Sequence, residues 1–394
     1  MLSHDNRIKC VAGVTWLVPS QTQPSGGYLV NLADGTCSCP DYELRRTRCK
    51  HQWAVEFAQT VAKSDKGDVV SQSISYSRAP QDRDWNAYNT AQCEEKETVE
   101  HLLRGLCDGI ETPAHAGRGR KPVPLSDAVF AMVMKVYVAM SARRATTDLE
   151  ASGEAGHMTK VPRYNTLFDY FEKPGMIELL TKLIEKSAAP LAAIETSFAV
   201  DSTGFGTAIY RRWYDQKYGR EVKEHTWLKA HAMIGTSTNI ITAVRVTDSS
   251  GADSPQLPGL VEATKQRFEM TEVSADKAYL GHENLAAIEA AGASPFIPFK
   301  INSQDDGSPA WRKMRAVFMF KHDEFLAAYS KRSAIESTFS SVKRKFGQSV
   351  RSKNFTAQVN EILCKVLCHN LSCLVMAMHR LGIEPSFLAK AVTC

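Results

Sequence analysis

A tyrosine, an arginine, a glutamate and a lysine share one face of the stretch from Phe325 to Phe346. The stretch contains no Gly or Pro, so we predict one long helix, which Asp323 can cap and Gly347 can end. At about 100° per residue, the four polar side chains fall within about 60° of one another. They are Tyr329, Arg332, Glu336 and Lys343. One carboxylate is therefore expected among three side chains that can bind anionic oxygen.

A second stripe of the same stretch is apolar and lies directly beside the polar stripe. It consists of Ile335, Phe339, Val342 and Phe346. Taken alone, this pattern is also typical of an amphipathic surface helix whose polar face is solvated. The choice between the two interpretations depends on whether other parts of the chain supply further carboxylates.

Two aspartates end stretches that are predicted to be strands. Asp201 ends the apolar part of SFAVDSTGF, and Asp276 ends the apolar part of EVSADKAY. From residue 195 onward the predicted order is strand, hairpin, helix, strand, helix, strand and the long helix, which is typical of a mixed α/β domain with a central sheet. In such sheets the carboxyl ends of strands face the ligand crevice. We therefore expect Asp201, Asp276 and Glu336 to meet there.

Three carboxylates that converge without Cys or His are typical of a site for hard divalent cations. Mg²⁺ prefers oxygen ligands and keeps positions open for water and phosphate oxygen. Without cations, each like-charge pair near 4 Å costs about 4 kcal/mol at an effective dielectric of about 20. Two Mg²⁺ ions about 3.5–4 Å apart cancel that repulsion and support in-line attack on a phosphodiester. Asp248 and Asp253, which follow the predicted hairpin, are alternative ligands.

The long predicted helix resembles the Y-x2-R-x3-E-x6-K signature of the DDE transposases of bacterial insertion sequences. FAVDSTGF, ADKAY and FIPFK resemble the strands of that family that carry and follow its two aspartates, and the resemblance covers about residues 123–380. It implies an RNase H-like fold with Asp201, Asp276 and Glu336 as the metal-binding triad. It also implies that Arg332 and Lys343 contact the DNA backbone and that Tyr329 helps to position it. The chain departs from many relatives in carrying Ala252, where they have His.

Cys37, Cys39, Cys49 and His51 form a CxC followed by a CxH. Two ligands on a turn and two at the start of a helix can close a tetrahedral shell around one structural Zn²⁺. The alternative is three buried cysteines beside an incidental histidine. With the preceding predicted strands, 7–18 and 27–32, the pattern resembles a SWIM zinc finger over residues 8 to about 62. SWIM fingers are implicated in binding DNA or protein, and the resemblance does not decide between these partners. Such a finger is not a usual part of the transposase family.

Positive charge is concentrated around Glu336. The 394-residue chain has a net charge of +5, but the stretch from Trp311 to Lys353 contains eleven Lys and Arg and three acidic residues, a local balance of +8. Such a block is often only a solvated surface. Here it suits double-stranded DNA, whose phosphates the exposed cations can contact. The candidates are Lys343, Arg344, Lys345, Arg351 and Lys353.

The region between the zinc motif and the predicted sheet divides into a linker and a group of helices. Residues 64–122 are predicted to be mostly polar linker, with one short helix near 99–106, and end in GRGRKP. Arg118 and Arg120 resemble a degenerate AT-hook for a minor groove, although a plain basic linker fits equally well. Four helices are then predicted near 126–143, 147–151, 161–172 and 175–186. They form either a helix-turn-helix DNA reader or a small helical connector.

Composition and the late apolar run bear on the compartment. Ten cysteines are too few for a disulfide scaffold in a chain of this length, which favours a reducing cytoplasm in which the protein is associated with the nucleoid. We find no signal peptide. The apolar run 362–378 contains Lys365 and His369, so we predict a core helix and no membrane span. Cys364, Cys368 and Cys373 on that helix are expected to be packing residues and not a second metal site.

The predicted domains are therefore a zinc finger (1–63), a linker (64–122), a helical DNA-binding region (123–194) and an RNase H-like catalytic domain (195–394). The predicted function is DNA transposition, with cleavage and strand transfer at a two-Mg²⁺ site, by a homodimer on DNA. One alternative is a structure-selective nuclease of the same fold that does not transfer strands. The other is a DNA-binding protein that keeps the fold without the activity.

Overall fold

The computed structural model describes residues 8–12, 14–20, 26–59, 61–63, 69–72, 84–112, 121–207, 217, 227–300, 303, 308–385 and 387. The chain divides into two compact units, Met1–Asp82 and Arg83–Cys394. Arg118 and Arg120 lie outside the described residues, so their predicted role in DNA binding stays a prediction.

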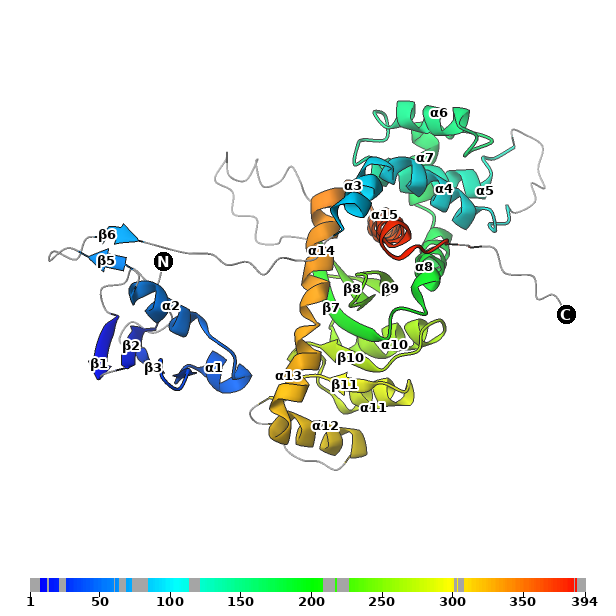
Figure 1. Cartoon of the computed structure of the whole chain (residues 1–394). Helices are drawn as coiled ribbons and strands as arrows, with labels where there is room; N and C mark the ends of the chain where they lie inside the picture. Colours follow the sequence, from blue (N-terminus) through cyan, green and yellow to red (C-terminus); the bar gives the residue numbers. More distant parts are fainter. Residues whose placement is uncertain are drawn as a thin grey trace. The chain divides into compact units, whose positions relative to one another are not determined.

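The first unit is a small antiparallel sheet with helices beside it (Figure 1). Its strands are β1 (Lys9–Ala12), β2 (Thr15–Pro19), β3 (Gly27–Asn31) and β4 (Thr36–Cys37), and its helices are α1 (Pro40–Arg45) and α2 (Lys50–Gln59). A two-stranded hairpin, β5 (Val61–Lys63) and β6 (Val69–Gln72), follows. The single strand predicted at 7–18 is wrong, because the chain turns back after Ala12 and β1 pairs with β2.

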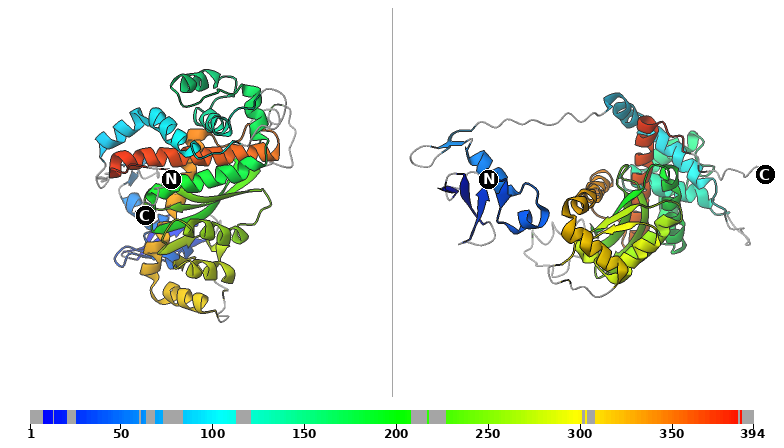
Figure 2. Two further views of the ribbon diagram at one scale, coloured as in Figure 1. Left: turned by 90° about the vertical axis from the view of Figure 1, so that its right-hand side faces the viewer. Right: turned by 60° about the horizontal axis from the view of Figure 1, so that its bottom comes forward.

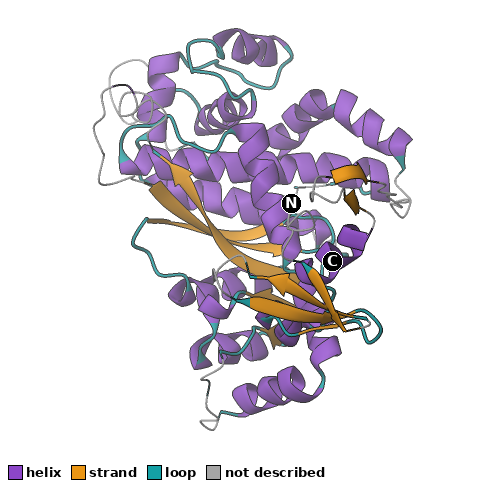
Figure 3. Cartoon of the chain, turned by 90° about the vertical axis from the view of Figure 1, so that its left-hand side faces the viewer, coloured by secondary structure: helices purple, strands orange, loops and turns teal. Residues whose placement is uncertain are grey.

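The second unit is built on a five-stranded mixed sheet of order β11-β10-β7-β8-β9 (Figure 3). The strands are β7 (Ser197–Gly206), β8 (Trp227–Gly235), β9 (Ile241–Asp248), β10 (Glu272–Ala275) and β11 (Ser294–Phe296). The first three form an antiparallel meander, and β10 and β11 add in parallel beside β7. This arrangement confirms the predicted mixed α/β sheet and is consistent with an RNase H-like fold.

The helices of this unit cover both faces of the sheet. They are α3 (Trp85–Cys93), α4 (Glu95–Cys107), α5 (Leu125–Tyr137), α6 (Thr146–Glu154), α7 (Tyr164–Phe171), α8 (Gly175–Ala188), α10 (Leu257–Lys265), α11 (His282–Ala290), α12 (Pro309–Phe320), α13 (His322–Ser330), α14 (Ser333–Phe346) and α15 (Phe355–Leu381). The helices predicted near 126, 147, 161 and 175 correspond to α5, α6, α7 and α8. Asn360 and Asn370 of α15 donate to backbone carbonyls of α7 and β9, which ties the helical layer to the sheet.

α15 is the central helix of the second unit. It is seen almost end-on in Figure 1 and lengthwise in Figure 2, between the sheet and the layer that contains α4, α5 and α7. By length and composition it is the one helix in the described residues that could cross a membrane, but 78% of its most apolar window is buried inside the protein. Lys365 and Glu361 are also buried within it. The predicted core helix is therefore confirmed.

Three predicted elements differ from the structure. The region predicted to be mostly linker contains α3 and α4; α4 includes the short helix predicted near 99–106, but Leu103 and Leu106 in it are fully buried in the main core. A further helix, α12, precedes the long helix and is absent from the predicted order of elements. The long helix itself is divided at Lys331 and Arg332, where N–H groups bond to carbonyls three residues earlier, as in a 3₁₀ turn.

The sequence predicted that Asp201 ends its strand, and this prediction is wrong. β7 runs five residues further, to Gly206, because β8 pairs with it along its whole length. The parallel neighbour β10 does stop at this level, since its last pair is Ala275 with Val200. Asp201 thus lies at the carboxyl edge of the parallel part of the sheet, beside the position of Asp276.

Candidate functional site

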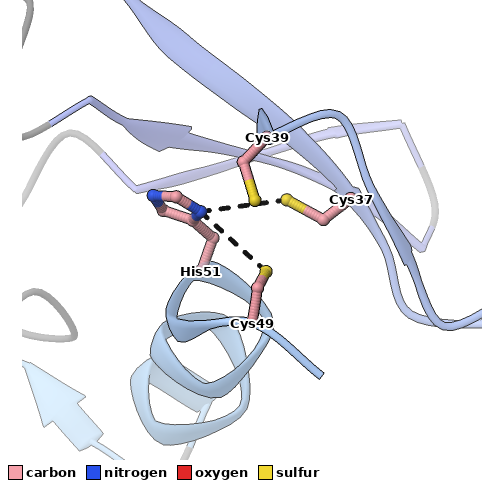
Figure 4. A group of neighbouring side chains, drawn as sticks. All are labelled: Cys37, Cys39, Cys49 and His51. Atoms are coloured by element: carbon pink, nitrogen blue, oxygen red, sulfur yellow. Dashed lines mark hydrogen bonds between the residues drawn. The ribbon is translucent and has the colours of Figure 1, made fainter. Parts of the chain in front are cut away.

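The four predicted zinc ligands come together in the first unit (Figure 4). Cys37 ends β4, Cys39 is the N-cap of α1, Cys49 directly precedes α2, and His51 lies in its first turn. Their ligand atoms all lie within 4.8 Å of one another, and all four residues are buried. His51 points its Nδ1 atom at the sulfurs, 3.9 Å from Cys37 Sγ and 3.9 Å from Cys49 Sγ.

Neighbouring groups hold these ligands in place. The Tyr42 N–H donates to Cys39 Sγ (3.3 Å), and the Cys49 N–H donates to Gln52 Oε1 (2.7 Å). Gln52 Nε2 in turn donates to the carbonyl of Gly35 (2.6 Å) in the turn before Cys37. Burial raises the pKa values of the Cys37 and Cys39 thiols, so the thiolates need a cation beside them. Three thiolates and one imidazole are the donor set of a closed structural zinc site.

The second candidate site is at the carboxyl edge of β7 and β10 in the second unit. Arg332, at the junction of α13 and α14, joins two of the predicted carboxylates. Its Nη1 donates to Asp201 Oδ2 (2.9 Å), and its Nη2 donates to Glu336 Oε1 (2.6 Å). Asp276 caps the short 3₁₀ turn after β10 by accepting from the Lys277 N–H (2.6 Å).

The charges of the three carboxylates act on one another. Burial raises the pKa of Asp201, and the charges of Asp276 and Glu336 raise it further. The Ser202 N–H and the Arg332 guanidinium act in the opposite direction. The carboxylates are less tightly gathered than the zinc ligands. In the part of the chain that the structure describes, the Cys37–His51 cluster is the one group of three or more His, Cys, Asp or Glu residues gathered closely enough to hold a metal ion, with its ligand atoms within 4.8 Å of one another. The positive charge between Asp201 and Glu336 is that of the Arg332 guanidinium.

The other residues of the predicted polar stripe lie beside these acids. Lys343 Nζ donates to Thr203 Oγ1 (2.7 Å), two residues beyond Asp201 on β7, and burial lowers the pKa of Lys343. The Arg332 guanidinium carbon lies 5.7 Å from the centre of the Tyr329 ring. The structure thus brings the tyrosine, the arginine, the glutamate and the lysine to one side of β7.

Two predicted DNA contacts lie elsewhere on α14. Arg344 is exposed to solvent. Lys345 is on the opposite flank of the helix, where it pairs with Glu95 of α4 and lines a cavity of about 740 Å³. Its role in DNA binding stays a prediction, and its charge, like that of Arg332, is already matched by a carboxylate.

The late cysteines and His369 do not gather into a ligand group. Cys364 and Cys368 are fully buried. Cys373 Sγ lies 3.3 Å from His369 Nε2, but that nitrogen also lies 2.9 Å from the Asn239 carbonyl. Packing, as predicted, accounts for these side chains.

A polar cluster beside the carboxylates was not predicted. Lys229 Nζ lies 2.8 Å from Asp253, and His231 Nδ1 lies 3.2 Å from the same carboxylate. Its sequence signal is the Lys-Ala-His alternation in β8, which places two basic side chains on one face of an interior strand. Asp248 is exposed and accepts from Ser250, whereas Asp253 is held in this cluster.

Comparison with protein families agrees with both sites. A family described as a transposase DDE domain matches residues 194–371, which contain the three carboxylates, and one described as a SWIM zinc finger matches residues 28–59, which contain the four zinc ligands. Both resemblances inferred from the sequence are confirmed. A transposase DDE domain supports the activity of a DNA-acting transposase. The chain therefore carries a transposase DDE domain at residues 194–371 and an amino-terminal SWIM zinc finger at residues 28–59.

Proposed function

We propose that this protein cleaves the ends of an insertion sequence and joins the freed 3′-hydroxyl groups to target DNA, with Asp201, Asp276 and Glu336 as the catalytic residues. The observation that carries the proposal is the arrangement around Arg332. One guanidinium donates to Asp201 and Glu336, while the charges of Asp276 and Glu336 both raise the pKa of Asp201. Acids from three distant parts of the chain therefore share one electrostatic environment.

This donor set fits Mg²⁺. It consists of carboxylate oxygens from within β7, from directly after β10 and from the first turn of α14, and the like charges favour a bound cation. When bound by Asp201, Asp276 and Glu336, two Mg²⁺ ions activate the attacking oxygen and stabilise the leaving oxygen. Arg332, which carries the compensating charge, is placed to bind a phosphate oxygen of the DNA as the acids take up cations.

The chain's own residues orient the DNA backbone in this proposal. Lys343 and Arg332 contact phosphates near the scissile bond, and Tyr329 helps to position it. Exposed Arg344, Arg351 and Lys353 extend the contact to phosphates further along the duplex. The protein acts as a homodimer on double-stranded DNA and is associated with the nucleoid in the cytoplasm.

The helical region 123–194 adds a further DNA contact in the proposed domain organisation. Glu150 and Glu154 of α6, and Asp169 of α7, are exposed, so the outer faces of these helices are unfavourable for DNA. Exposed Arg143 and Arg163 flank them, and the Arg143 guanidinium lies 4.9 Å from the Tyr164 ring. We assign the DNA contact to these arginines, at the ends of the helices.

Replacement of Glu336 tests the catalytic assignment. Glu336→Gln keeps the shape of the side chain but removes its charge, and we expect it to abolish Mg²⁺-dependent cleavage of a labelled duplex that carries the element's end. Binding of that duplex should be retained. The matched control is Glu324→Gln on α13, whose carboxylate is exposed and pairs with Lys321. Cleavage by the Glu336 variant at the wild-type rate would exclude this residue from catalysis.

The same substrate separates the alternatives. Cleavage followed by joining to a target plasmid supports a transposase. Hydrolysis without joining, under all conditions in which the ends are bound, indicates a nuclease. Binding without Mg²⁺-dependent cleavage by the wild-type chain indicates a DNA-binding protein that has kept only the fold.

A further inference from the structure

Three buried polar atoms without a well-formed hydrogen bond lie together near the proposed catalytic acids. Five such side-chain atoms occur in the described residues. Three of them are His231 Nδ1, the Tyr279 hydroxyl and Asp253 Oδ1, the last of which lies within ion-pair distance of Lys229. His231 is fully buried and Tyr279 is 1% exposed. Because such atoms are costly to bury, a cluster of them at one place indicates a constraint other than core packing.

The cluster lies on the opposite side of β7 from Asp201. Side chains alternate along a strand, so Ser202 faces away from Asp201 and toward its partner on β8, His231. Burial acts to raise the pKa of Asp253, but hydrogen bonds from Lys229 and Ser202 more than offset it and lower the pKa. Asp253 is therefore an ionised carboxylate bound to the residue next to Asp201.

A second set of contacts joins Asp253 to Asp276. Asn284 of α11 is buried, and its Nδ2 donates to Ser254 Oγ (2.9 Å) and to the Tyr279 carbonyl (2.7 Å). The Tyr279 N–H donates to the Asp276 carbonyl (2.9 Å), which closes the turn that follows Asp276. Burial raises the pKa of Tyr279, and the charge of Asp253 raises it further, so the phenol and the carboxylate are neighbours.

The contacts of Asp253 do not suit a direct metal ligand. Its two oxygens each lie 2.8 Å from Lys229 Nζ, and Oδ1 also lies 3.2 Å from His231 Nδ1. A lysine that is largely buried already neutralises this carboxylate. A cation at Asp253 would have to displace Lys229 from this carboxylate.

We propose that Asp253 is a positioning residue that fixes the separation of Asp201 and Asp276, through Ser202 on one side and through Ser254, Asn284 and Tyr279 on the other. This inference rests on the proposed function, in which Asp201 and Asp276 bind the same pair of Mg²⁺ ions. Groups of this kind orient metal ligands, and their loss typically lowers metal affinity or activity about 10- to 100-fold. Asp253 thus acts on the metal site without touching the metal.

Asp253→Asn tests the proposal, because it keeps the shape of the side chain and removes the charge that holds Lys229. We expect the Mg²⁺ concentration for half-maximal cleavage to rise about 10- to 100-fold. The affinity for Mn²⁺, measured directly by electron paramagnetic resonance on the full-length protein, should fall by a similar factor. Circular dichroism should be unchanged. The matched control is Glu283→Gln, an exposed carboxylate of α11 next to Asn284, which should leave both readouts within about twofold of the wild type.

A second variant is needed if Lys229, left without Asp253, disturbs the fold. Lys229→Met combined with Asp253→Asn removes both charges, and we expect it to restore stability but not Mn²⁺ affinity. Wild-type Mn²⁺ affinity in a folded Asp253→Asn protein would overturn the proposal, as would recovery of that affinity in the double variant. A wild-type protein that binds Mn²⁺ at Asp201 and Asp276 without cleaving DNA would overturn only the proposed function.

Discussion

The two candidate sites show two ways of bringing ligands together. In the first unit, four ligands come from residues 37 to 51, and their atoms already lie within 4.8 Å of one another. In the second unit, Asp201, Asp276 and Glu336 come from three distant elements, and Arg332 stands between two of them. A short segment thus forms a closed site, whereas a large scaffold holds an open one.

The cores beneath the sites differ in the same way. Around the zinc ligands the fully or largely buried apolar residues of the first unit are few, namely Val18, Val30, Ala54 and Val55 together with the three cysteines. The second unit has a continuous core that includes the sheet and α15. Zinc is therefore expected to stabilise the fold of the first unit, while the fold of the second unit is expected to exist before any cation binds.

Loss of one zinc ligand should produce the largest effect. Cys49→Ser leaves three ligands and a core too small to fold alone, so we expect residues 8–59 to lose their ordered structure. Structural zinc supplies on the order of 10–16 kcal/mol in zinc-finger peptides. The measurements are zinc content and the dispersion of amide signals in NMR spectra. The second unit should melt at an unchanged temperature, because it forms a separate compact unit.

Cys10→Ser is the matched control for this prediction. Cys10 is in the same unit, but it is exposed on β1 and outside the ligand cluster. Its replacement should change neither zinc content nor the spectrum. A Cys49→Ser protein that still binds one zinc ion per chain and keeps its fold would show that the scaffold, and not the metal, forms this site.

The scaffold of the open site should respond to pH through Lys365. Its buried Nζ donates to the carbonyls of Gly347 (2.8 Å) and Ser349 (2.7 Å). These two hydrogen bonds fix the loop after α14. Burial lowers the pKa of Lys365 from 10.5 to about 8, although Glu361 acts against this shift. Between these two values the unfolded chain binds more protons than the folded one, so stability rises with pH there.

We therefore expect the free energy of unfolding of the wild type to increase relative to Lys365→Met between pH 8 and 10.5. The difference is at most about 3 kcal/mol, from about 1.4 kcal/mol per pKa unit. Chemical denaturation at several pH values measures it. Lys353→Met, an exposed lysine of the same loop, should run parallel to the wild type. If the stability of Lys365→Met also runs parallel to that of the wild type over this pH range, Lys365 is not the titrating group.

Replacement of Arg332 tests whether Mg²⁺ can take over the role of its positive charge beside Asp201 and Glu336. Without cations, Arg332→Gln leaves Asp201 and Glu336 without their shared donor, and we expect a loss of about 1–2 kcal/mol of stability, since Glu336 is largely exposed. Mg²⁺ should stabilise this variant more than it stabilises the wild type, because the ions replace the missing charge. Thermal melts with and without Mg²⁺ measure the effect. Arg344→Gln, which removes an exposed cation of the same helix, should show no such difference.

The comparison also explains what the sequence could predict. The zinc ligands were found because short spacings put them on one turn and one helix start, which are local properties. Asp201 and Asp276 were found because both follow apolar strands, although β7 continues past Asp201. That continuation depends on its pairing with β8. The end of a strand is set by its neighbour and not by its own residues.

α4 is longer than the helix predicted near 99–106, and α12 is absent from the predicted order of elements. α4 contains Glu95, a polar residue that is buried because Lys345, 250 positions away, pairs with it. A pair between residues so far apart in the sequence cannot be predicted from a local pattern. α12 begins with Ser308 as N-cap and Pro309 in its first turn, which is a favourable helix start, although proline also occurs in loops. The distant partner Lys345 explains why the length of α4 was not predicted, and the proline at the start of α12 explains why that helix was not predicted.

The smallest expected effect distinguishes the two flanks of α14. Lys343, beside Thr203 and the acids, is free of a carboxylate partner in the described contacts, whereas Lys345 pairs with Glu95. A cation that contacts a phosphate releases counterions, and each such contact contributes about 0.9 to the slope of log affinity against log salt. Lys343→Gln should therefore weaken DNA binding and reduce that slope by about 1. Lys345→Gln should leave the slope unchanged, because its charge is already compensated within the protein. Fluorescence anisotropy with a labelled duplex at several salt concentrations measures both slopes. Equal reductions in the two variants would mean that DNA contacts both flanks, so that Lys345 exchanges Glu95 for phosphate and α4 borders the DNA surface.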